Sequence, residues 1–200
     1  MTHDVEPLTL TESSLAHYFM TRLADCAERF RPPPHPDTCW YLGNMLERFG
    51  RSERLFAWED GRMTLRPLAQ LYGDAIEARN ERERCLLLQQ LGDMALFIGA
   101  LYPQRYARRG IRQDYFVGMG GGAYDYLSDN AQRGRHVFGE LARTFTRMLE
   151  MIATVCARPD EPSDEDVLTL YQRWLETRDP VAERRLRTLG IALSETDTTH

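Results

Sequence analysis

One carboxylate lies in the most apolar stretch of the chain. Asp93 stands between Cys85 and Leu101, where two glutamines are the only other strongly polar residues. A buried carboxylate must be paired or hydrogen-bonded, because an unpaired buried charge costs on the order of several kcal/mol. We therefore expect an arginine or a tyrosine from residues 102–126 to contact Asp93. The contact is either a structural tie between helices or part of a site with a perturbed pKa.

An arginine cluster follows this stretch, interleaved with Tyr106 and followed by Tyr115. Guanidinium groups bind carboxylates and phosphates in a bidentate manner and stack on aromatic rings. The segment therefore suits an anionic ligand, RNA or an acidic protein surface. The alternative is a solvated connector whose arginines pair with nearby acids such as Asp93 and Asp114. The cluster consists of Arg105, Arg108, Arg109 and Arg112.

A run of glycines comes next, in the sequence GMGGG from Gly118 to Gly122. It is not a phosphate loop, because no strand pattern precedes it and no Gly-Lys-Ser/Thr follows it. In a helix, Gly118, Gly121 and Gly122 would share one face, which predicts close approach of another backbone. The alternative is a helix that is broken at the glycines, since each glycine costs a helix about 1 kcal/mol relative to alanine.

Metal-binding and nucleophilic patterns are weak in this chain. Cys26, His35 and Cys39 have irregular spacing for zinc, and no CxxC motif occurs. His136 and Glu140 are four residues apart and could share a metal, but the ExxH pairs of di-iron bundles are missing. We interpret these two as a surface pair, and we expect no metal, no cofactor and no catalytic residue.

The composition excludes several enzyme classes. All 25 basic residues are arginine, so there is no lysine for a Walker motif, a Schiff base or a kinase-type site. The net charge of −5 argues against broad binding of nucleic acid. The middle of the chain, residues 84–147, has nine arginines against five acids, so an anionic partner should meet this part.

The hydrophobic pattern predicts an all-α fold in one domain. A chain of 200 residues with 42% hydrophobic residues is long enough for one core. Helical periodicity recurs in most segments, and residues 85–101 are apolar nearly all round, which indicates a buried central helix. We expect a single bundle of about seven helices around it and a flexible tail at 191–200. Residues 54–66 form at most one small hairpin, with an irregular, partly helical loop as the alternative.

The termini of the predicted helices are marked by individual residues. Asn80 is the predicted N-cap of the central helix, and Pro103 follows its end. Residues 136–156 are predicted as one long helix. The sequence shows no signal segment and no apolar span of 18 residues, so we expect a cytoplasmic protein that does not enter membranes.

The patterns LGDMALFIGALYP and DYFVGMGGGAYDYLS resemble an uncharacterised family of all-helical bacterial proteins, over roughly residues 40–150. The family has no activity attached to it, so the resemblance implies only a helical fold. It also supports the interpretation of Asp93, Tyr115 and Tyr124 as parts of one constellation.

Two hypotheses for the function follow. The first is an interaction or regulatory protein that docks an acidic protein surface or another anionic ligand through its arginine-rich middle, with self-association through the glycine face. The second is a small-ligand-binding protein or enzyme with a pocket formed by Asp93, Arg109, Tyr115 and Tyr124. The missing lysines and the missing Ser/Cys–His signature favour the first.

Overall fold

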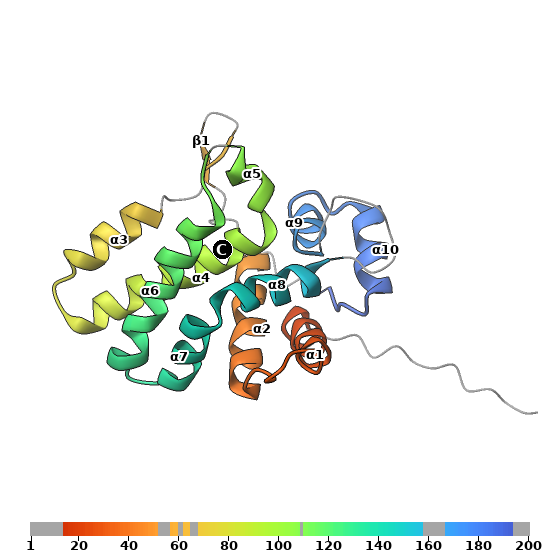
Figure 1. The fold of residues 1–200 in the computed structure, drawn as a ribbon. Helices are drawn as coiled ribbons and strands as arrows, with labels where there is room; N and C mark the ends of the chain where they lie inside the picture. The colour runs from red at the N-terminus through yellow and green to blue at the C-terminus, as the bar shows by residue number, and fades with distance from the viewer. Residues whose placement is uncertain are drawn as a thin grey trace, which may run out of the picture.

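The computed structural model describes residues 14–51, 57–59, 62–64, 68–108, 110–157 and 167–193; among them, the side chains of 57–59, 62–64, 104 and 105 are not described. Figure 1 shows the helices and strands of these ranges. They are α1 (Leu15–Ala27), α2 (Pro36–Arg51), β1 (Ala57–Glu59), β2 (Arg62–Thr64), α3 (Leu68–Ile76), α4 (Glu81–Leu101), α5 (Pro103–Ala107), α6 (Gln113–Asn130), α7 (Arg135–Arg143), α8 (Phe145–Cys156), α9 (Val167–Thr177) and α10 (Pro180–Thr188).

The all-α prediction is confirmed, and so is the small hairpin. Strands β1 and β2 pair antiparallel, with Trp58 opposite Met63. The predicted count of about seven helices is too low, because the described residues alone form ten. One reason is that residues 136–156 form two helices. The chain leaves helical geometry at Thr144, whose hydroxyl group donates to the Glu140 carbonyl oxygen at 2.7 Å.

Helix α4 is the predicted buried helix. The Asn80 side chain accepts a hydrogen bond from the Glu83 N–H group at 2.9 Å, as expected for its N-cap. From Leu91 to Ala100 every residue is buried, against α3, α6 and α8. We expected no apolar span of 18 residues, but α4 is long and apolar enough to cross a membrane. Most of its apolar stretch is buried inside the protein.

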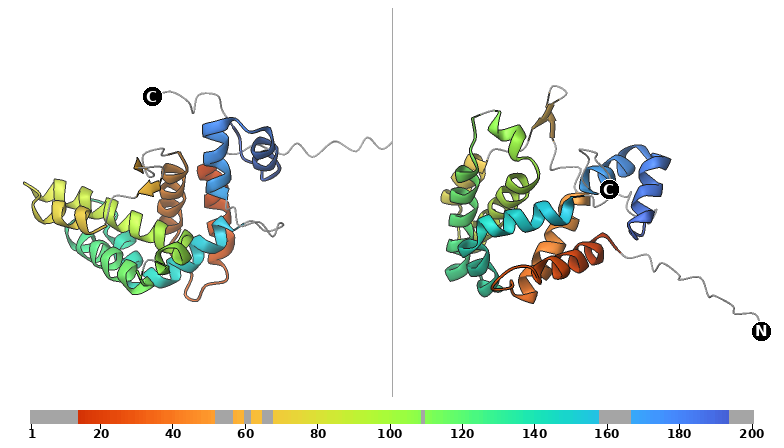
Figure 2. Two further views of the ribbon diagram at one scale, coloured as in Figure 1. Left: turned by 90° about the horizontal axis from the view of Figure 1, so that it is seen from above. Right: turned by 45° about the vertical axis from the view of Figure 1, so that its right-hand side comes forward.

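The expected single bundle around α4 is not matched. Helix α1 packs on α2 and α8, and α9 packs on α10 and α2, so these helices form a second group. Figures 1 and 2 show α3 at one end of the molecule and α10 at the other. Helix α2 connects the groups, since it also contacts α7.

The glycine run is helical, and the glycine that allows close packing is Gly120. A Cβ atom there would lie 2.6 Å from Phe145 Cε2 and 2.9 Å from Ala95 Cβ. The prediction for the face of Gly118, Gly121 and Gly122 was wrong at Gly118 and Gly122, because a Cβ atom on either would meet nothing within 4 Å. A Cβ atom on Gly121 would lie 3.9 Å from the Ala142 carbonyl oxygen of α7. Gly120 faces α4 and α8 instead, and its missing side chain lets α6 approach them.

The end of the chain departs in part from the predicted tail. Ile191 is fully buried, so the first residue after Gly190 packs on the core. Residues 194–200 lie outside the described ranges.

Candidate functional site

Asp93 is buried and holds three helices together. Its Oδ1 atom accepts hydrogen bonds from the hydroxyl groups of Tyr124, on α6, at 2.8 Å and of Tyr41, on α2, at 2.5 Å. Its Oδ2 atom accepts from the Arg48 guanidinium, also on α2, at 2.7 Å. The predicted contact with a tyrosine of residues 102–126 is confirmed. The arginine comes from α2, which the sequence interpretation missed.

The Asp93 carboxylate is fully satisfied by the three donors of its network. Burial raises the pKa of Asp93 above the usual value of an aspartate, and the hydrogen bond from Tyr41 and the charge of Arg48 oppose that rise. Burial also raises the pKa of Tyr41 and of Tyr124 well above the usual tyrosine value, so both hydroxyl groups keep their protons and donate. Asp93 therefore acts as a structural tie.

The structure separates the residues of the predicted constellation. Asp93 and Tyr124 are in contact, but Tyr115 is exposed at the start of α6 and its ring lies against Phe116. Arg109 lies outside the described residues. Within the described residues, no hydrogen bond or ring contact joins Tyr115 to Asp93 or Tyr124, and the predicted pocket of Asp93, Arg109, Tyr115 and Tyr124 stays a prediction.

A half-open groove of about 770 Å³ lies between α2, the first half of α4, and the turn from α6 to α7. Two large apolar side chains on its surface, Trp40 and Leu86, are 62% and 60% exposed. Tyr41 joins the groove to the Asp93 network, because it lines the groove while its hydroxyl donates to Asp93 and accepts from Gln89 Nε2 at 3.1 Å. The aromatic, aliphatic and thiol residues of the lining are Trp40, Tyr41, Cys85, Leu86, Leu127, Ala131, Val137 and Phe138.

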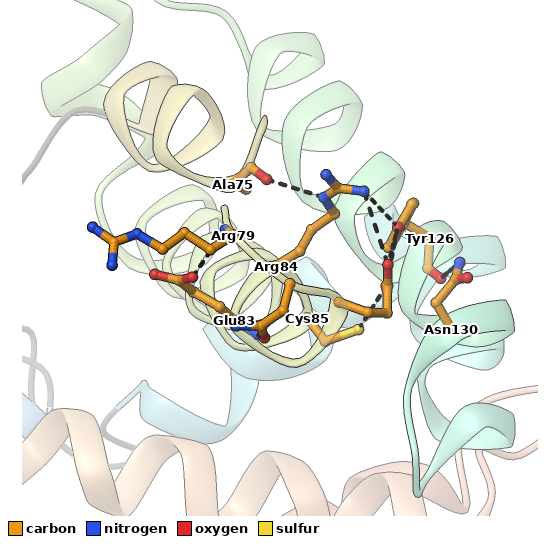
Figure 3. A network of polar contacts seen from close by, with 9 residues as sticks. Ala75, Arg79, Glu83, Arg84, Cys85, Tyr126 and Asn130 are labelled. Atoms are coloured by element: carbon orange, nitrogen blue, oxygen red, sulfur yellow. Dashed lines mark hydrogen bonds and ion pairs between the residues drawn. The ribbon is translucent and has the colours of Figure 1, made fainter. Parts of the chain in front are cut away.

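A polar network fixes one wall of the groove (Figure 3). The Tyr126 hydroxyl on α6 donates to the Glu81 carboxylate at 3.0 Å, and it accepts from Arg84 at 3.4 Å. The Arg84 Nε–H group donates to the Ala75 carbonyl oxygen at the end of α3. Helices α3, α4 and α6 are thus held together where Glu81 and Cys85 line the groove.

Cys85, which lines the groove, is a poor nucleophile, and so are Cys26 and Cys39 elsewhere in the protein. Burial raises the pKa of the Cys85 thiol, and the thiol donates to the Glu81 carboxylate, which raises that pKa further. Burial also raises the pKa of Cys26 and of Cys39. These three cysteines therefore carry protonated thiols at neutral pH.

The predicted pairing of His136 with Glu140 is wrong. The ring of His136 contacts the Asp37 carboxylate, with 2.8 Å from Nε2 to Oδ2. The Glu140 carboxylate instead accepts from the His35 backbone N–H group at 3.0 Å and from the Thr38 hydroxyl at 2.5 Å. The segment before α2 and the helix α7 are therefore joined at the edge of the groove.

The described side chains of the arginine cluster, Arg108 and Arg112, do not belong to the groove. Arg108 and Arg112 are exposed, and Arg112 makes a long contact of 3.8 Å with the exposed carboxylate of Asp114. The side chain of Arg105 and the whole of Arg109 are outside the described part of the structure. Neither Arg108 nor Arg112 lines the groove.

No protein-family model matches this chain, and neither a curated protein nor a solved structure does. The function is therefore argued from the geometry of the molecule.

Proposed function

We propose that the protein binds a small, largely apolar molecule in the groove between α2, α4 and the α6–α7 turn. The carrying observation is the volume of about 770 Å³, which falls in the range of roughly 300–1,000 Å³ that small-molecule sites occupy. The exposure of Trp40 and Leu86 supports the same conclusion, because exposed apolar surface often marks a place where a ligand binds.

The lining indicates the chemical class of the ligand. The rings of Tyr41 and Phe138 lie edge to face with centroids 5.5 Å apart, and Trp40 stands near them in the lining. Aromatic walls of this kind suit a flat apolar ligand. Asp37, Glu81, Arg82 and Arg133 provide charges of both signs around it, so polar groups on the ligand would fix its orientation.

Binding is favoured over catalysis. The Cys85 thiol is protonated and bonded to Glu81, and the Asp93 carboxylate behind the groove is occupied by three donors. Nucleophiles are activated by a general base, by a lowered pKa or by a metal, and the pKa of the Cys85 thiol is raised. The groove therefore has the features of a binding site.

The uncharged fluorescent probe N-phenyl-1-naphthylamine tests the groove. We expect saturable binding to the full chain, accompanied by an increase in the fluorescence of the probe. Leu86→Arg places a charge on the apolar surface and should weaken binding by about tenfold or more, which corresponds to about 1.4 kcal/mol. Ile76→Arg is the matched control, because Ile76 on α3 is 59% exposed and does not line the groove. Equal weakening by both substitutions would contradict the proposal.

A second candidate function is docking of an acidic protein surface by the arginine-rich middle. The exposure of Arg108 and Arg112 supports it, because exposed guanidinium groups are free to bind carboxylates. The test is a pull-down with the four clustered arginines changed together to glutamine. The control makes the same charge change at the exposed Arg29, Arg79, Arg184 and Arg187. Unchanged partners in the clustered variant would contradict docking.

A further inference from the structure

Two imidazole rings and one carboxylate meet at the edge of the groove, from two segments about a hundred residues apart. His35 precedes α2, Asp37 lies in the first turn of α2, and His136 lies in the first turn of α7. Their ligand atoms all lie within 4.8 Å of one another. From Asp37 Oδ2 it is 2.8 Å to His136 Nε2 and 3.7 Å to His35 Nδ1.

We propose that His35, Asp37 and His136 form a binding site for a divalent transition metal of the Zn²⁺ class. A tetrahedral zinc site with bonds of about 2.0–2.1 Å places neighbouring ligand atoms about 3.3 Å apart, and the two distances above bracket this value. Imidazole nitrogen selects zinc and its transition-metal neighbours over Ca²⁺ and Mg²⁺, which prefer oxygen ligands. Three protein ligands leave a position open for a further ligand.

The charges at the cluster agree with a cation site. Within the described ranges, the side-chain contacts of the Asp37 carboxylate are with the two imidazole rings, and no ion pair with an arginine is found for it there. The Glu140 carboxylate lies beside the cluster, bonded to the backbone of His35. Two carboxylates thus surround two imidazoles that are half exposed and accessible to an ion.

The backbone around the cluster is held in place. Pro34 and Pro36 flank His35 and restrict its backbone. Glu140 is one turn along α7 from His136, so the helix that carries one imidazole also fixes the segment that carries the other. The Asp37 N–H group donates to His35 Nδ1 at 3.1 Å. An ion that binds Nδ1 of His35 takes the place of the Asp37 N–H group there. The Asp37 N–H group must then lose this hydrogen bond.

The site does not depend on a ligand in the groove, although Asp37 and His136 also line the groove. An ion at this edge has its open position near the groove. The alternative for the cluster is a hydrogen-bonded surface group, in which the His136 ring donates to Asp37 without any metal. Titration with the metal alone separates the two.

The full chain is treated with a chelator, dialysed and titrated with ZnCl₂ by calorimetry. We expect one saturable equivalent, and we expect His136→Ala and His35→Ala each to weaken binding by more than about tenfold, since even outer-shell changes weaken metal sites by that much. His17→Ala is the control, because His17 is exposed on α1. Binding that is unchanged in His136→Ala, or the absence of a saturable equivalent, would overturn the site.

Two further measurements keep the test decisive. The visible absorption of bound Co²⁺ reports direct coordination and should be lost in Asp37→Asn, which replaces an exposed side chain and leaves the fold intact. A Co²⁺ spectrum that is the same in Asp37→Asn and the wild type would contradict the ligand set. Leu86→Arg should bind Zn²⁺ like the wild type, so failure of the groove and failure of the metal site give different results.

Discussion

At the scale of single residues, Asp93 shows how a buried charge sets the positions of its neighbours. Three donors from two helices surround one carboxylate that is 2% exposed. Arg48 reaches it from the surface, with its side chain 57% exposed, whereas Tyr124 is fully buried. The two partners would therefore respond differently to loss of the carboxylate. The Arg48 guanidinium can be hydrated instead, whereas the buried Tyr124 hydroxyl group cannot.

Replacement of Asp93 by alanine should lower the free energy of unfolding by about 3 kcal/mol, because a buried Tyr124 hydroxyl and the Tyr41 hydroxyl lose their acceptor. Urea denaturation measures the change. Asp125→Ala, at an exposed aspartate of α6, is the control and should change stability by less than about 0.5 kcal/mol. Equal effects of the two substitutions would show that Asp93 is not a tie.

The stability of the protein should also depend on pH through Asp93. Because burial raises the pKa of Asp93 in the folded state, the folded protein binds this proton at a higher pH than the unfolded chain does. The stability that Asp93 gains from binding this proton is therefore full below the unfolded pKa and is lost as pH rises through the folded pKa. Unfolding of the wild type and of Asp93→Asn is compared between about pH 7 and about pH 4.5. As pH falls, the free energy of unfolding of the wild type should rise relative to that of the variant. The opposite slope would mean that the charge of Arg48 affects the pKa of Asp93 more strongly than burial does.

At the scale of elements, the glycines of α6 have two different roles. Gly120 lets α6 approach α4 and α8, whereas Gly118 and Gly122 face open space. The glycine run therefore combines one position that packing requires with others that weaken the helix.

Alanine substitutions should separate these roles. Gly120→Ala inserts a methyl group against Phe145 and Ala95 and should destabilise the protein by about 1–3 kcal/mol. Gly122→Ala should stabilise it by up to about 1 kcal/mol, because alanine is the better helix former and the position is exposed. Thermal unfolding of both variants is the measurement. Changes of the same sign would contradict the assignment of faces.

The elements also show what could be predicted from the sequence. Local patterns were sufficient for α4 and for its Asn80 cap, because these residues are close along the chain. The contact of Asp93 with a tyrosine of residues 102–126 was predicted for another reason: a carboxylate on an apolar helix needs a partner, which is Tyr124, 31 residues away. Arg48 and Tyr41 were missed, although their spacing of seven places them on one face of α2. Which face of α2 meets α4 is decided by long-range packing, and a single sequence carries little signal for it.

The groove and the histidine cluster were missed for the same reason. Trp40 and Leu86 have the periodicity of core residues, and only the packed structure shows that no helix of the described ranges covers them. His136 lies 99 residues from Asp37, so its spacing to Glu140 pointed to the wrong partner.

At the scale of the whole molecule, α2 connects the helix group around α4 with the group of α1, α9 and α10. It also provides one wall of the groove, the Asp37 carboxylate at its edge, and two donors to Asp93. The position of this helix therefore decides whether the groove exists in its binding shape. Tyr41 is the residue that couples the two features, since its ring lines the groove and its hydroxyl is held by Asp93.

Replacement of Tyr41 by phenylalanine keeps the ring in the groove and removes only the hydroxyl. If the tie to Asp93 holds α2 in place, binding of N-phenyl-1-naphthylamine should weaken by about threefold to tenfold, equivalent to about 0.7–1.4 kcal/mol. Tyr18→Phe is the matched control, because the Tyr18 hydroxyl accepts a hydrogen bond from Arg22 on the same helix and Tyr18 does not line the groove. Both variants lose one hydroxyl group, so a general loss of stability affects both. Probe affinity that is the same in Tyr41→Phe and the wild type, together with a lower melting temperature, would show that Asp93 stabilises the fold without shaping the groove.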